Sequence, residues 1–396
     1  MGKPGVLAID IGTSFIKVFS GSSDSSGNVL IYGNGIISTK GFSKGVITNQ
    51  NEMITSISQA VECAFAADNI VTKQAYIGIS GMGVEFHEAI GSIALKIDET
   101  ISNSDIDKVY RAAVLALIPD ELEVLHVLPK TFKVDGIASP SPIGSKGKHL
   151  EAEVQIITIP KAILTELVRG VESAGVNVSG VISNTYALGE SIGDISPPKP
   201  CVVFDIGAGH TDVILANNGQ IHAAYSLPLG GDYITWDLMH GLDINNEHAE
   251  AIKRYYSKLD KELFGNEVIL DCNDFGTTDK NIPYDFLNKI IESRVDEIVN
   301  LICEYIKPKI TGFDCEEIYI TGGCSAMNSF AERLEVNFGI PVKRFVPAGM
   351  PQEYSNPVNT ACYGITRYAV RNIPVYEDDS NSWSSIIKKV RKFLKN

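Results

Sequence analysis

Residues 6–13 have the sequence VLAIDIGT, and residues 201–208 repeat its pattern, 195 positions later, as CVVFDIGA. Each copy is a short apolar run that ends at an aspartate and a glycine, and a second apolar run follows. This pattern predicts a β-hairpin bent at Gly12 and at Gly207. Because self-similarity over a long interval marks a duplicated unit, the sequence predicts two related halves.

Composition and charge limit the classes of function. The 396 residues are 44% hydrophobic and 21% charged, as in a folded protein of two to four lobes. The net charge is −14, although residues 383–396 carry five Lys/Arg and no acid. An acidic body of this kind excludes nucleic acid as the general partner. Seven cysteines without metal-ligand spacing, no secretory signal and no long apolar run predict a cytoplasmic protein without a transmembrane span.

Apolar spacing predicts the main elements. Helices are expected over 51–68, 160–175 and 285–306, and strands over 31–38 and 74–80. Mixed sheets flanked by helices place the chain in the α/β class.

Two segments interrupt the halves. Residues 82–159 contain enough strands and helix for a small α+β subdomain, and residues 241–304 form a mainly helical insertion. The proline-rich stretch 196–200 is typical of a stiff connector.

The two hairpins carry the chemistry that we expect. Asp10 and Asp205 occupy matching positions, so they are predicted to face each other across a cleft, where carboxylates hold Mg²⁺ through its water shell. Turn N–H groups, the hydroxyls of Thr13 and Ser14, and the charge of Lys17 suit a phosphate. These features together predict that a triphosphate binds between the two turns. The alternative is that the aspartates cap their own turns and the other side chains are exposed.

A third turn follows a later strand. Residues 318–325 have the sequence IYITGGCS, in which a Gly-Gly pair ends a strand before a helix. Such a turn allows the backbone to approach a nucleoside closely. Taken alone, it is equally an ordinary β–α connection.

Together with further segments, these motifs resemble a known superfamily. The order of the first hairpin, SNTYALG at 183–189, DIGAGHTD at 205–212, TGG at 321–323 and ACYG at 361–364 is similar to the five-motif pattern of the actin/Hsp70/sugar-kinase superfamily. More narrowly, the chain resembles the FtsA family of bacterial cell-division proteins. This narrower resemblance rests on GFSKGVI at 41–47, VLHVLP at 124–129, FKVDG at 132–136, PIG at 142–144, LPLGG at 227–231 and the basic C-terminus.

The resemblance implies an actin-like ATPase fold of two related lobes with two inserted subdomains and a C-terminal amphipathic helix. The implied cofactors are ATP and Mg²⁺. The implied division is a first lobe (1–81, 160–199 and 346–374) interrupted by the subdomain 82–159, a second lobe (200–240 and 305–345) interrupted by 241–304, a linker (375–382) and the final helix (383–396).

The resemblance also implies the site residues. Asp10 and Asp205 would position Mg²⁺ and phosphate. The nucleotide-binding residues would be Gly12, Thr13, Ser14 and Lys17 in the first turn, Gly207, Ala208, Gly209, His210 and Thr211 in the second, Gly322, Gly323 and Ser325 around the adenosine, and Glu250 and Lys253 beside the adenine. An exposed helix pair is the alternative for the last two.

The second phosphate turn departs from the family pattern. Ala208 and His210 stand where the family usually has glycine or threonine. The imidazole adds bulk or a titrating group beside a phosphate, unless it points to solvent. Because turnover also needs an oriented water, this change argues against fast hydrolysis more than against binding, so we expect a slow ATPase at most.

The last fourteen residues have helical amphipathic spacing. Apolar residues occupy an arc of roughly 120° and basic residues fill the rest, which is typical of a helix lying in a membrane interface. A partner groove and packing on the protein's own core are the alternatives. The predicted membrane residues are Trp383, Ile386, Ile387, Lys388, Lys389, Val390, Arg391, Lys392, Phe393 and Leu394.

The resemblance implies a scaffold that tethers filaments of the tubulin-like protein FtsZ to the inner face of the cytoplasmic membrane at the division site. It also implies head-to-tail self-assembly and contacts with other division proteins. The C-terminal peptide of FtsZ would dock on residues 241–304, with Lys289, Arg294 and Asn300 as contacts. A pilus-assembly adaptor and a sugar or acetate-type kinase remain the alternatives.

Overall fold

The structure is a computed structural model that describes residues 5–43, 46–66, 72, 74–81, 83–96, 99–193, 199–257, 269–271 and 281–372. The predicted linker 375–382 and the amphipathic segment 383–396 lie outside the described residues, as does most of the connector 196–200. Among the described helices, none is both long and apolar enough to cross a bilayer.

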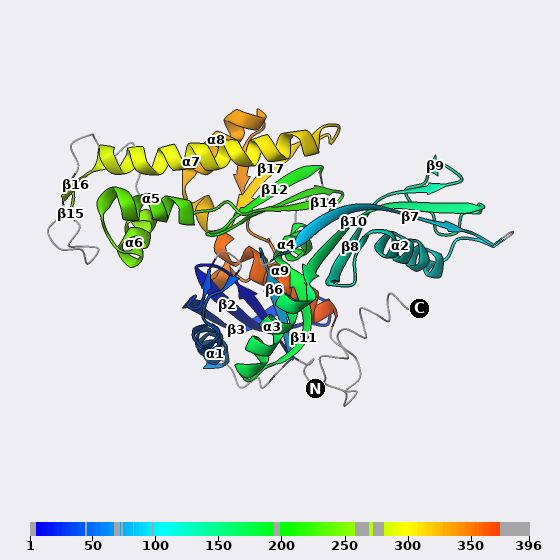
Figure 1. Ribbon diagram of the computed structural model, residues 1–396, viewed down its shortest axis with the longest axis horizontal. Helices are drawn as coiled ribbons and strands as arrows, with labels where there is room; N and C mark the ends of the chain where they lie inside the picture. Colours follow the sequence, from blue (N-terminus) through cyan, green and yellow to red (C-terminus); the bar gives the residue numbers. More distant parts are fainter. Residues whose placement is uncertain are drawn as a thin grey trace.

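Two five-stranded sheets have the same strand order (Figure 1). In each, three antiparallel strands formed by consecutive segments are joined to two later strands that run parallel to the first. The first sheet is ordered β11-β6-β1-β2-β3, with β1 Val6–Ile11, β2 Phe15–Ser23, β3 Val29–Ser38, β6 Gln74–Ile79 and β11 Asn177–Ser183. The second is ordered β14-β13-β12-β17-β18, with β12 Cys201–Ile206, β13 Thr211–Asn217, β14 Gln220–Leu227, β17 Glu317–Thr321 and β18 Val342–Arg344.

The register of the two leading hairpins is also the same. Asp10 pairs with Lys17 across β1 and β2, and Asp205 pairs with Asp212 across β12 and β13. Adding 195 to either member of the first pair gives the corresponding member of the second. The predicted duplication into two related lobes is therefore confirmed.

Alternation along β1 explains how the first sheet is covered on both faces. Leu7 and Ile9 pack against α1 (Gln50–Ala66) and α3 (Lys161–Ser173), whereas Ala8 packs with α9 (Thr360–Arg371). Successive side chains of a strand point to opposite faces, so a strand between two helical layers is apolar throughout. The predicted helices over 51–68 and 160–175 agree with α1 and α3 to within two residues.

The second sheet is covered by a larger helical layer. Its core joins the sheet to α5 (Asp232–Leu242), α6 (Asn246–Tyr256), α7 (Tyr284–Ile306) and α8 (Asn328–Phe338). The helix predicted over 285–306 is α7, and its buried residues recur at the spacing of one helix face. The short hairpin of β15 (Ile269–Asp271) and β16 (Asn281–Pro283) lies before α7 and has no counterpart in the sequence prediction. A second two-stranded pair, β4 (Phe42–Ser43) and β5 (Val46–Ile47), precedes α1.

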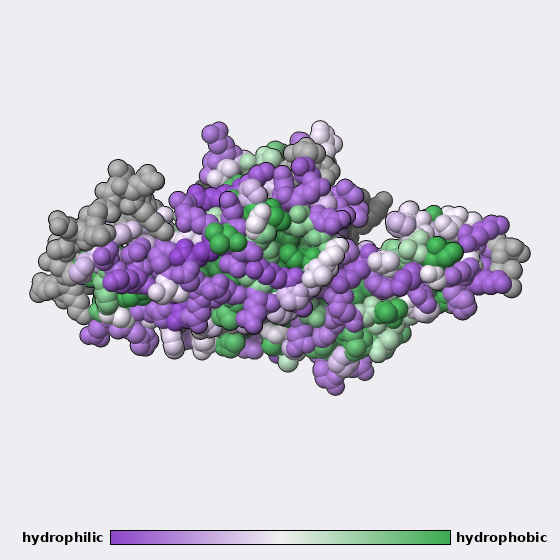
Figure 2. Space-filling view, turned by 90° about the horizontal axis from the view of Figure 1, so that it is seen from above, coloured by the Kyte–Doolittle hydropathy of each residue, from purple (hydrophilic) through white to green (hydrophobic). Residues whose placement is uncertain are grey.

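Residues 85–160 build a separate antiparallel sheet with one helix. The strand order is β7-β10-β8-β9, and α2 packs on one face. The elements are β7 Glu85–Ala94, α2 Asn103–Leu117, β8 Leu122–Val134, β9 Ile137–Ala138 and β10 His149–Pro160. This inserted subdomain extends to one side of the lobes (Figure 1). Seen from above, the surface is mostly hydrophilic, with hydrophobic patches near its centre and on the inserted subdomain at the right-hand end (Figure 2).

The base of the inserted subdomain contacts both lobes. Leu128 and Ile157 share a core with Leu188 and with Ile214 of the second sheet. The buried side chain of Gln155 also accepts a hydrogen bond of 2.8 Å from the backbone N–H of Ala224 in β14. The subdomain is therefore fixed at the junction between the lobes.

Two helices, α4 (Asn184–Ile192) and α9, lie between the sheets and pack closely against each other. Gly364 makes this approach possible, because a Cβ there would lie 1.9 Å from the carbonyl oxygen of Ala187. A backbone carbonyl cannot rotate away as a side chain can. The distance between α4 and α9 therefore depends on a glycine at this position.

We expect Gly364→Ala to lower the free energy of unfolding by about 1–3 kcal/mol, the usual cost of overpacking a close contact. Urea denaturation followed by circular dichroism measures this change. The matched control is Gly170→Ala in α3, where a Cβ would approach only the terminal methyl group of Met53, at 2.6 Å. Since alanine favours helix, the control should stay within about 1 kcal/mol of the original chain. Equal effects of the two substitutions would contradict this account of the contact.

Candidate functional site

The turns of the two leading hairpins have the same geometry. The backbone N–H of Gly12 donates to the carbonyl of Phe15 at 3.1 Å, and that of Gly207 donates to the carbonyl of His210 at 2.9 Å. A Cβ at Gly12 would lie 2.8 Å from the Phe15 oxygen. The tight turn therefore needs glycine.

The two turns come together between the lobes. A Cβ at Gly209 would lie 2.5 Å from the hydroxyl of Thr13, so the second turn touches the first. Beside this contact is a cavity of about 400 Å³, which is in the size range of small-molecule sites. Of the residues predicted from the sequence, the cavity is lined by Asp10, Gly12, Thr13, Ser14, Lys17, Asp205, Gly207, Ala208, Gly209, His210, Glu250, Lys253, Gly322 and Gly323.

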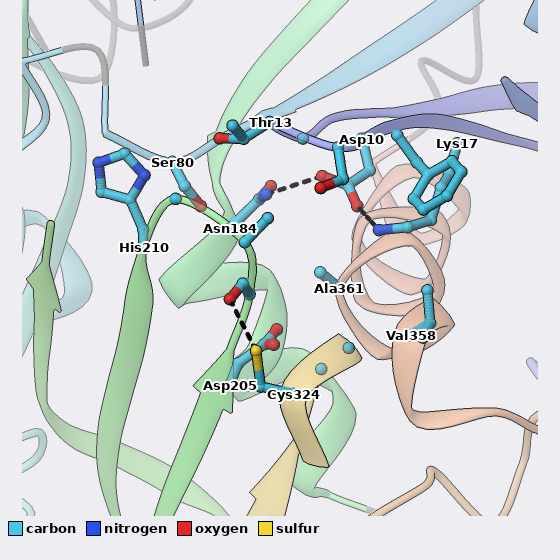
Figure 3. Close-up of a pocket in the computed structure, with 18 of the residues that line it drawn as sticks. Asp10, Thr13, Lys17, Ser80, Asn184, Asp205, His210, Cys324, Val358 and Ala361 are labelled. Carbon is cyan, nitrogen blue, oxygen red and sulfur yellow. Dashed lines mark hydrogen bonds and ion pairs between the residues drawn. The ribbon is translucent and has the colours of Figure 1, made fainter. Parts of the chain in front are cut away.

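Asp10 is buried at one side of the cavity and is held by two side chains (Figure 3). Its carboxylate accepts from the Lys17 ammonium at 2.6 Å and from the Asn184 amide at 2.8 Å. Burial acts to lower the pKa of Lys17, but the charge and hydrogen bond of Asp10 outweigh it, so the pKa is raised. Lys17 is therefore a fixed positive charge at neutral pH, and the alternative that it is an exposed strand residue is wrong.

Asp205 has a different electrostatic environment. Its partner across the strands is Asp212, a second carboxylate, where the first hairpin has Lys17. Burial raises the pKa of Asp205 to about 7, the charge of Asp212 adds to this, and Lys17 opposes it. Gly322, at φ +83°, leaves room for the carboxylate, because a Cβ there would lie 2.2 Å from its Oδ1. The second hairpin thus presents negative charge that its own residues do not neutralise.

Asp212 also joins the two lobes. Its carboxylate accepts from the Ser80 hydroxyl at 2.8 Å and from the Thr185 hydroxyl at 2.9 Å. Ser80 follows β6 in the first sheet, and Thr185 lies at the start of α4. Because Asp212 is buried, these bonds lie deep in the cleft.

The residues present fit a hydrated divalent cation. Within the described residues there is no group of three or more His, Cys, Asp or Glu arranged to hold a metal ion directly. Asp10, Asp205 and Asp212 nevertheless line the same cavity as Lys17, and Oδ1 of Asn184 is buried without a hydrogen-bond partner. Mg²⁺ commonly binds in this way, through one or two carboxylates, water and phosphate.

The helix α6 forms another wall of the cavity. Lys253 donates to the carbonyl of Gly231 at 3.1 Å and to the hydroxyl of Thr235 at 2.6 Å, and it forms an ion pair with Glu250. Burial acts to raise the pKa of Glu250, but Lys253 outweighs it and the pKa is lowered. Since Lys253 is 7% exposed, the alternative of a solvated helix pair is wrong.

Two predicted residues do not line the cavity. Thr211 is buried and donates to the carbonyl of Leu229, and Ser325 is buried and donates to the carbonyl of Gly322. Their hydroxyls shape the adjoining turns. His210 lines both this cavity and a neighbouring one of about 360 Å³, so its ring does not simply point to solvent. Burial lowers the pKa of His210, and the charges of Asp212 and Asp232 oppose that shift.

Several lining residues were not predicted, among them Ser80, Asn184, Asp212, Phe15 and Arg254. The repeat contains a signal for Asp212, since it occupies the position of Lys17 in the second hairpin. Ser80 follows β6, which lies beside β1 only in the folded sheet, so spacing along the chain gives no sign of it. Asn184 follows β11 and lies within the SNTYALG motif, which pointed to the superfamily but not to the contact with Asp10.

The predicted partner residues do not form one cluster on α7. Lys289 and Asn300 are exposed and lie about 20° apart on ideal helix geometry, whereas Arg294 lies about 140° from Lys289. Arg294 is partly buried and forms ion pairs with Asp237 of α5 and Glu297.

The fold is that of the actin-like ATPases. Among solved structures, the chain is similar to one of the PilM–PilN type IV pilus biogenesis complex, with a TM-score of 0.68 and 14% identity, covering 92% of this chain and 98% of that one. It is also similar to MreB 5 of Spiroplasma citri bound to AMPPNP, with a TM-score of 0.51 and 13% identity over 99% of each chain.

Sequence comparison identifies the family within this class. A model of the cell-division protein FtsA matches residues 202–364, and a model of the SHS2 domain inserted in FtsA matches residues 81–158. FtsA of Pseudomonas aeruginosa is 28% identical, covering 92% of this chain and 89% of the relative, and FtsA of Bacillus subtilis is 29% identical, covering 92% and 83%. The chain belongs to the FtsA family of cell-division proteins.

We expect Asp205→Asn to change how stability depends on pH. The ordinary pKa of the carboxyl is 3.8 and the folded value is about 7, so between these values the folded state binds more protons than the unfolded state. The free energy of unfolding contributed by Asp205 therefore falls as pH rises toward 7. Asparagine removes this titration. Without nucleotide or divalent ions, the free energy of unfolding of the variant should therefore be about 1–3 kcal/mol higher than that of the original chain at pH 8, and the two should be equal near pH 4.

Urea denaturation at pH 4, 6 and 8 measures that difference. The control is Asp314→Asn, a substitution of an exposed carboxylate in the second lobe. Its effect should be small at every pH. A constant difference between Asp205→Asn and the original across this range would show that Asp205 ionises as an ordinary carboxyl.

Proposed function

We propose that this chain binds ATP with Mg²⁺ in the cleft between its lobes. The observation that supports this most directly is the meeting of two duplicated hairpins, each with an aspartate before its turn, around a cavity of about 400 Å³. The similar fold of MreB 5 was solved bound to AMPPNP, an ATP analogue. The FtsA family match is consistent with the same use of the cleft.

The residues of the two turns would hold the phosphates, and the Gly322–Gly323 turn and α6 would border the nucleoside. Mg²⁺, when bound, neutralises phosphate charge. Asp205 and Asp10 would orient its water shell, and the hydrogen bonds from Lys17 and Asn184 would hold the Asp10 carboxylate in place. We propose slow hydrolysis at most, because His210 occupies space beside the second phosphate turn.

We expect Asp10→Ala to weaken binding of ATP–Mg²⁺ at least tenfold, since it removes one carboxylate and leaves Lys17 without its partner. Fluorescence titration with a labelled ATP analogue gives the dissociation constant. Asp314→Ala, which removes an exposed carboxylate away from the cleft, should leave the constant unchanged. EDTA should abolish binding to the original chain. Unchanged affinity of Asp10→Ala would mean that the nucleotide does not use this cleft.

The biological role that we propose is a scaffold rather than an enzyme. In this role the chain recruits FtsZ to the inner face of the cytoplasmic membrane at the division site, assembles with further copies, and contacts other division proteins. Family membership supports the division role, and the amphipathic pattern of residues 383–396 supports the membrane contact. Rapid phosphate transfer to a small metabolite would instead favour the kinase alternative.

For the FtsZ contact, we propose a surface that spans two sides of α7 and the neighbouring α5, because Lys289 and Arg294 do not share one face of α7. We propose that the bound peptide is acidic; the net charge of −14 disfavours its general adhesion, so local cations are needed. Lys289 is exposed, and Trp236, which is 58% exposed beside His240, offers an aromatic surface. Arg294, which already has two acidic partners, would contribute through its aliphatic stem and its position over Tyr233.

We expect deletion of residues 383–396 to abolish co-sedimentation with anionic liposomes, because it removes six apolar and five basic residues that suit an interface. Co-sedimentation of FtsZ with the liposomes should be lost at the same time, while binding of FtsZ in solution persists. The matched control is the double variant Ile387→Ser and Phe393→Ser, which keeps every charge and the length. This variant should also fail to co-sediment with the liposomes if the apolar face inserts into the membrane. Binding that survives the deletion would count against the tether.

A further inference from the structure

The cleft is bridged between the lobes at two depths. At the floor of the cleft, the buried Asp212 carboxylate accepts hydrogen bonds from the hydroxyls of Ser80 and Thr185. Toward solvent, the guanidinium of Arg254 lies over the ring of Phe15, 4.8 Å from the ring centroid. The Arg254 side chain is 53% exposed, and both residues line the cavity, so this second bridge lies at the cleft mouth.

We propose that Phe15 and Arg254 form a clasp across the cleft mouth that slows the exchange of bound nucleotide. The inference rests on the proposed nucleotide binding and goes further, because it assigns control of exchange to two side chains from opposite lobes. Neither residue was among the binding residues predicted from the sequence.

Both halves of the clasp are anchored. Phe15 begins β2 directly after the first turn, and its carbonyl accepts from the N–H of Gly12. Arg254 lies on α6 and forms an ion pair of 3.5 Å with Glu250, which is itself paired with buried Lys253. The contact therefore joins two rigid parts of the molecule rather than two loose side chains.

Opening of the mouth has to separate α6 from the first hairpin, and this movement breaks the contact between cation and ring. An arginine over an aromatic ring at a partly exposed site stabilises by about 0.5–1 kcal/mol, which corresponds to a factor of about two to five in a rate. The clasp should therefore change the rate of dissociation by this factor without supplying most of the affinity.

A competing account gives Arg254 a role on the nucleotide itself, with Phe15 as a bystander. The two accounts differ at Phe15. Leucine at 15 keeps an apolar side chain of similar size but has no aromatic face, whereas tyrosine keeps the face. Comparison of these variants separates the clasp from a direct contact between Arg254 and the nucleotide.

The test is the dissociation rate of a fluorescent ATP analogue with Mg²⁺, measured by stopped-flow chase with excess ATP on the full chain. Phe15→Leu and Arg254→Met should each speed dissociation about two- to fivefold, and Phe15→Tyr should keep the slow rate of the original chain. In the Phe15→Leu background, Arg254→Met should speed dissociation by a smaller factor than it does in the original chain, because the contact is already lost.

The outcomes distinguish failure of the clasp from failure of the proposed function. A rate for Phe15→Leu equal to that of the original chain, or fully additive effects in the double variant, overturns the clasp while the nucleotide site stands. Absence of any binding by the original chain overturns the proposed function instead. Should Phe15→Leu fold poorly by circular dichroism, Phe15→Met, which is also apolar and lacks an aromatic face, replaces it. Faster dissociation from Phe15→Met supports the clasp, and a rate equal to that of the original chain overturns it.

Discussion

The architecture of the site depends on the close approach of two turns that come from opposite lobes. Gly209 touches Thr13, so the distance between the lobes at this point is set by backbone and by one hydroxyl. Everything around it follows from this contact: the aspartates before the turns enter the same cavity, and Asp212 is near enough to bond with Ser80 and Thr185. A side chain at Gly209 would collide with the Thr13 hydroxyl, so a larger residue there would push the two turns apart.

Duplication provides this geometry, but it does not produce electrostatic symmetry. The two hairpins share a register, yet Lys17 balances Asp10 in one and Asp212 opposes Asp205 in the other. The Asp10 carboxylate is therefore paired with a cation at 2.6 Å, whereas burial and the charge of Asp212 raise the pKa of Asp205 to about 7. Such a site favours an anionic ligand that arrives with its own cation, because the protein leaves part of the negative charge of the cleft unneutralised.

The fold was largely predictable because its determinants are local or repeated. The aspartate-glycine hairpins, the alternation in β1 and the helical spacing in α1, α3 and α7 are all visible in the chain. The cavity lining was predictable only where the repeat or the family resemblance pointed to it. Ser80 was missed because its place in the site follows from strand order, and Asn184 because its motif was used only for the family resemblance. Phe15 and Arg254 were missed because their contact joins residues of different lobes. Thr211 and Ser325 belong to the right turns, but their hydroxyls bond to backbone within the protein.

The inserted subdomain is built into the rest of the molecule at its base. Gln155 satisfies the amide of Ala224, and Leu128 and Ile157 belong to a core that also contains residues of α4 and the second sheet. Excision of residues 85–160 would therefore leave an unsatisfied amide and an open apolar surface at the centre of the protein. A subdomain taken from a relative would therefore need an acceptor side chain at position 155 for the amide of Ala224 and apolar side chains of similar size at positions 128 and 157.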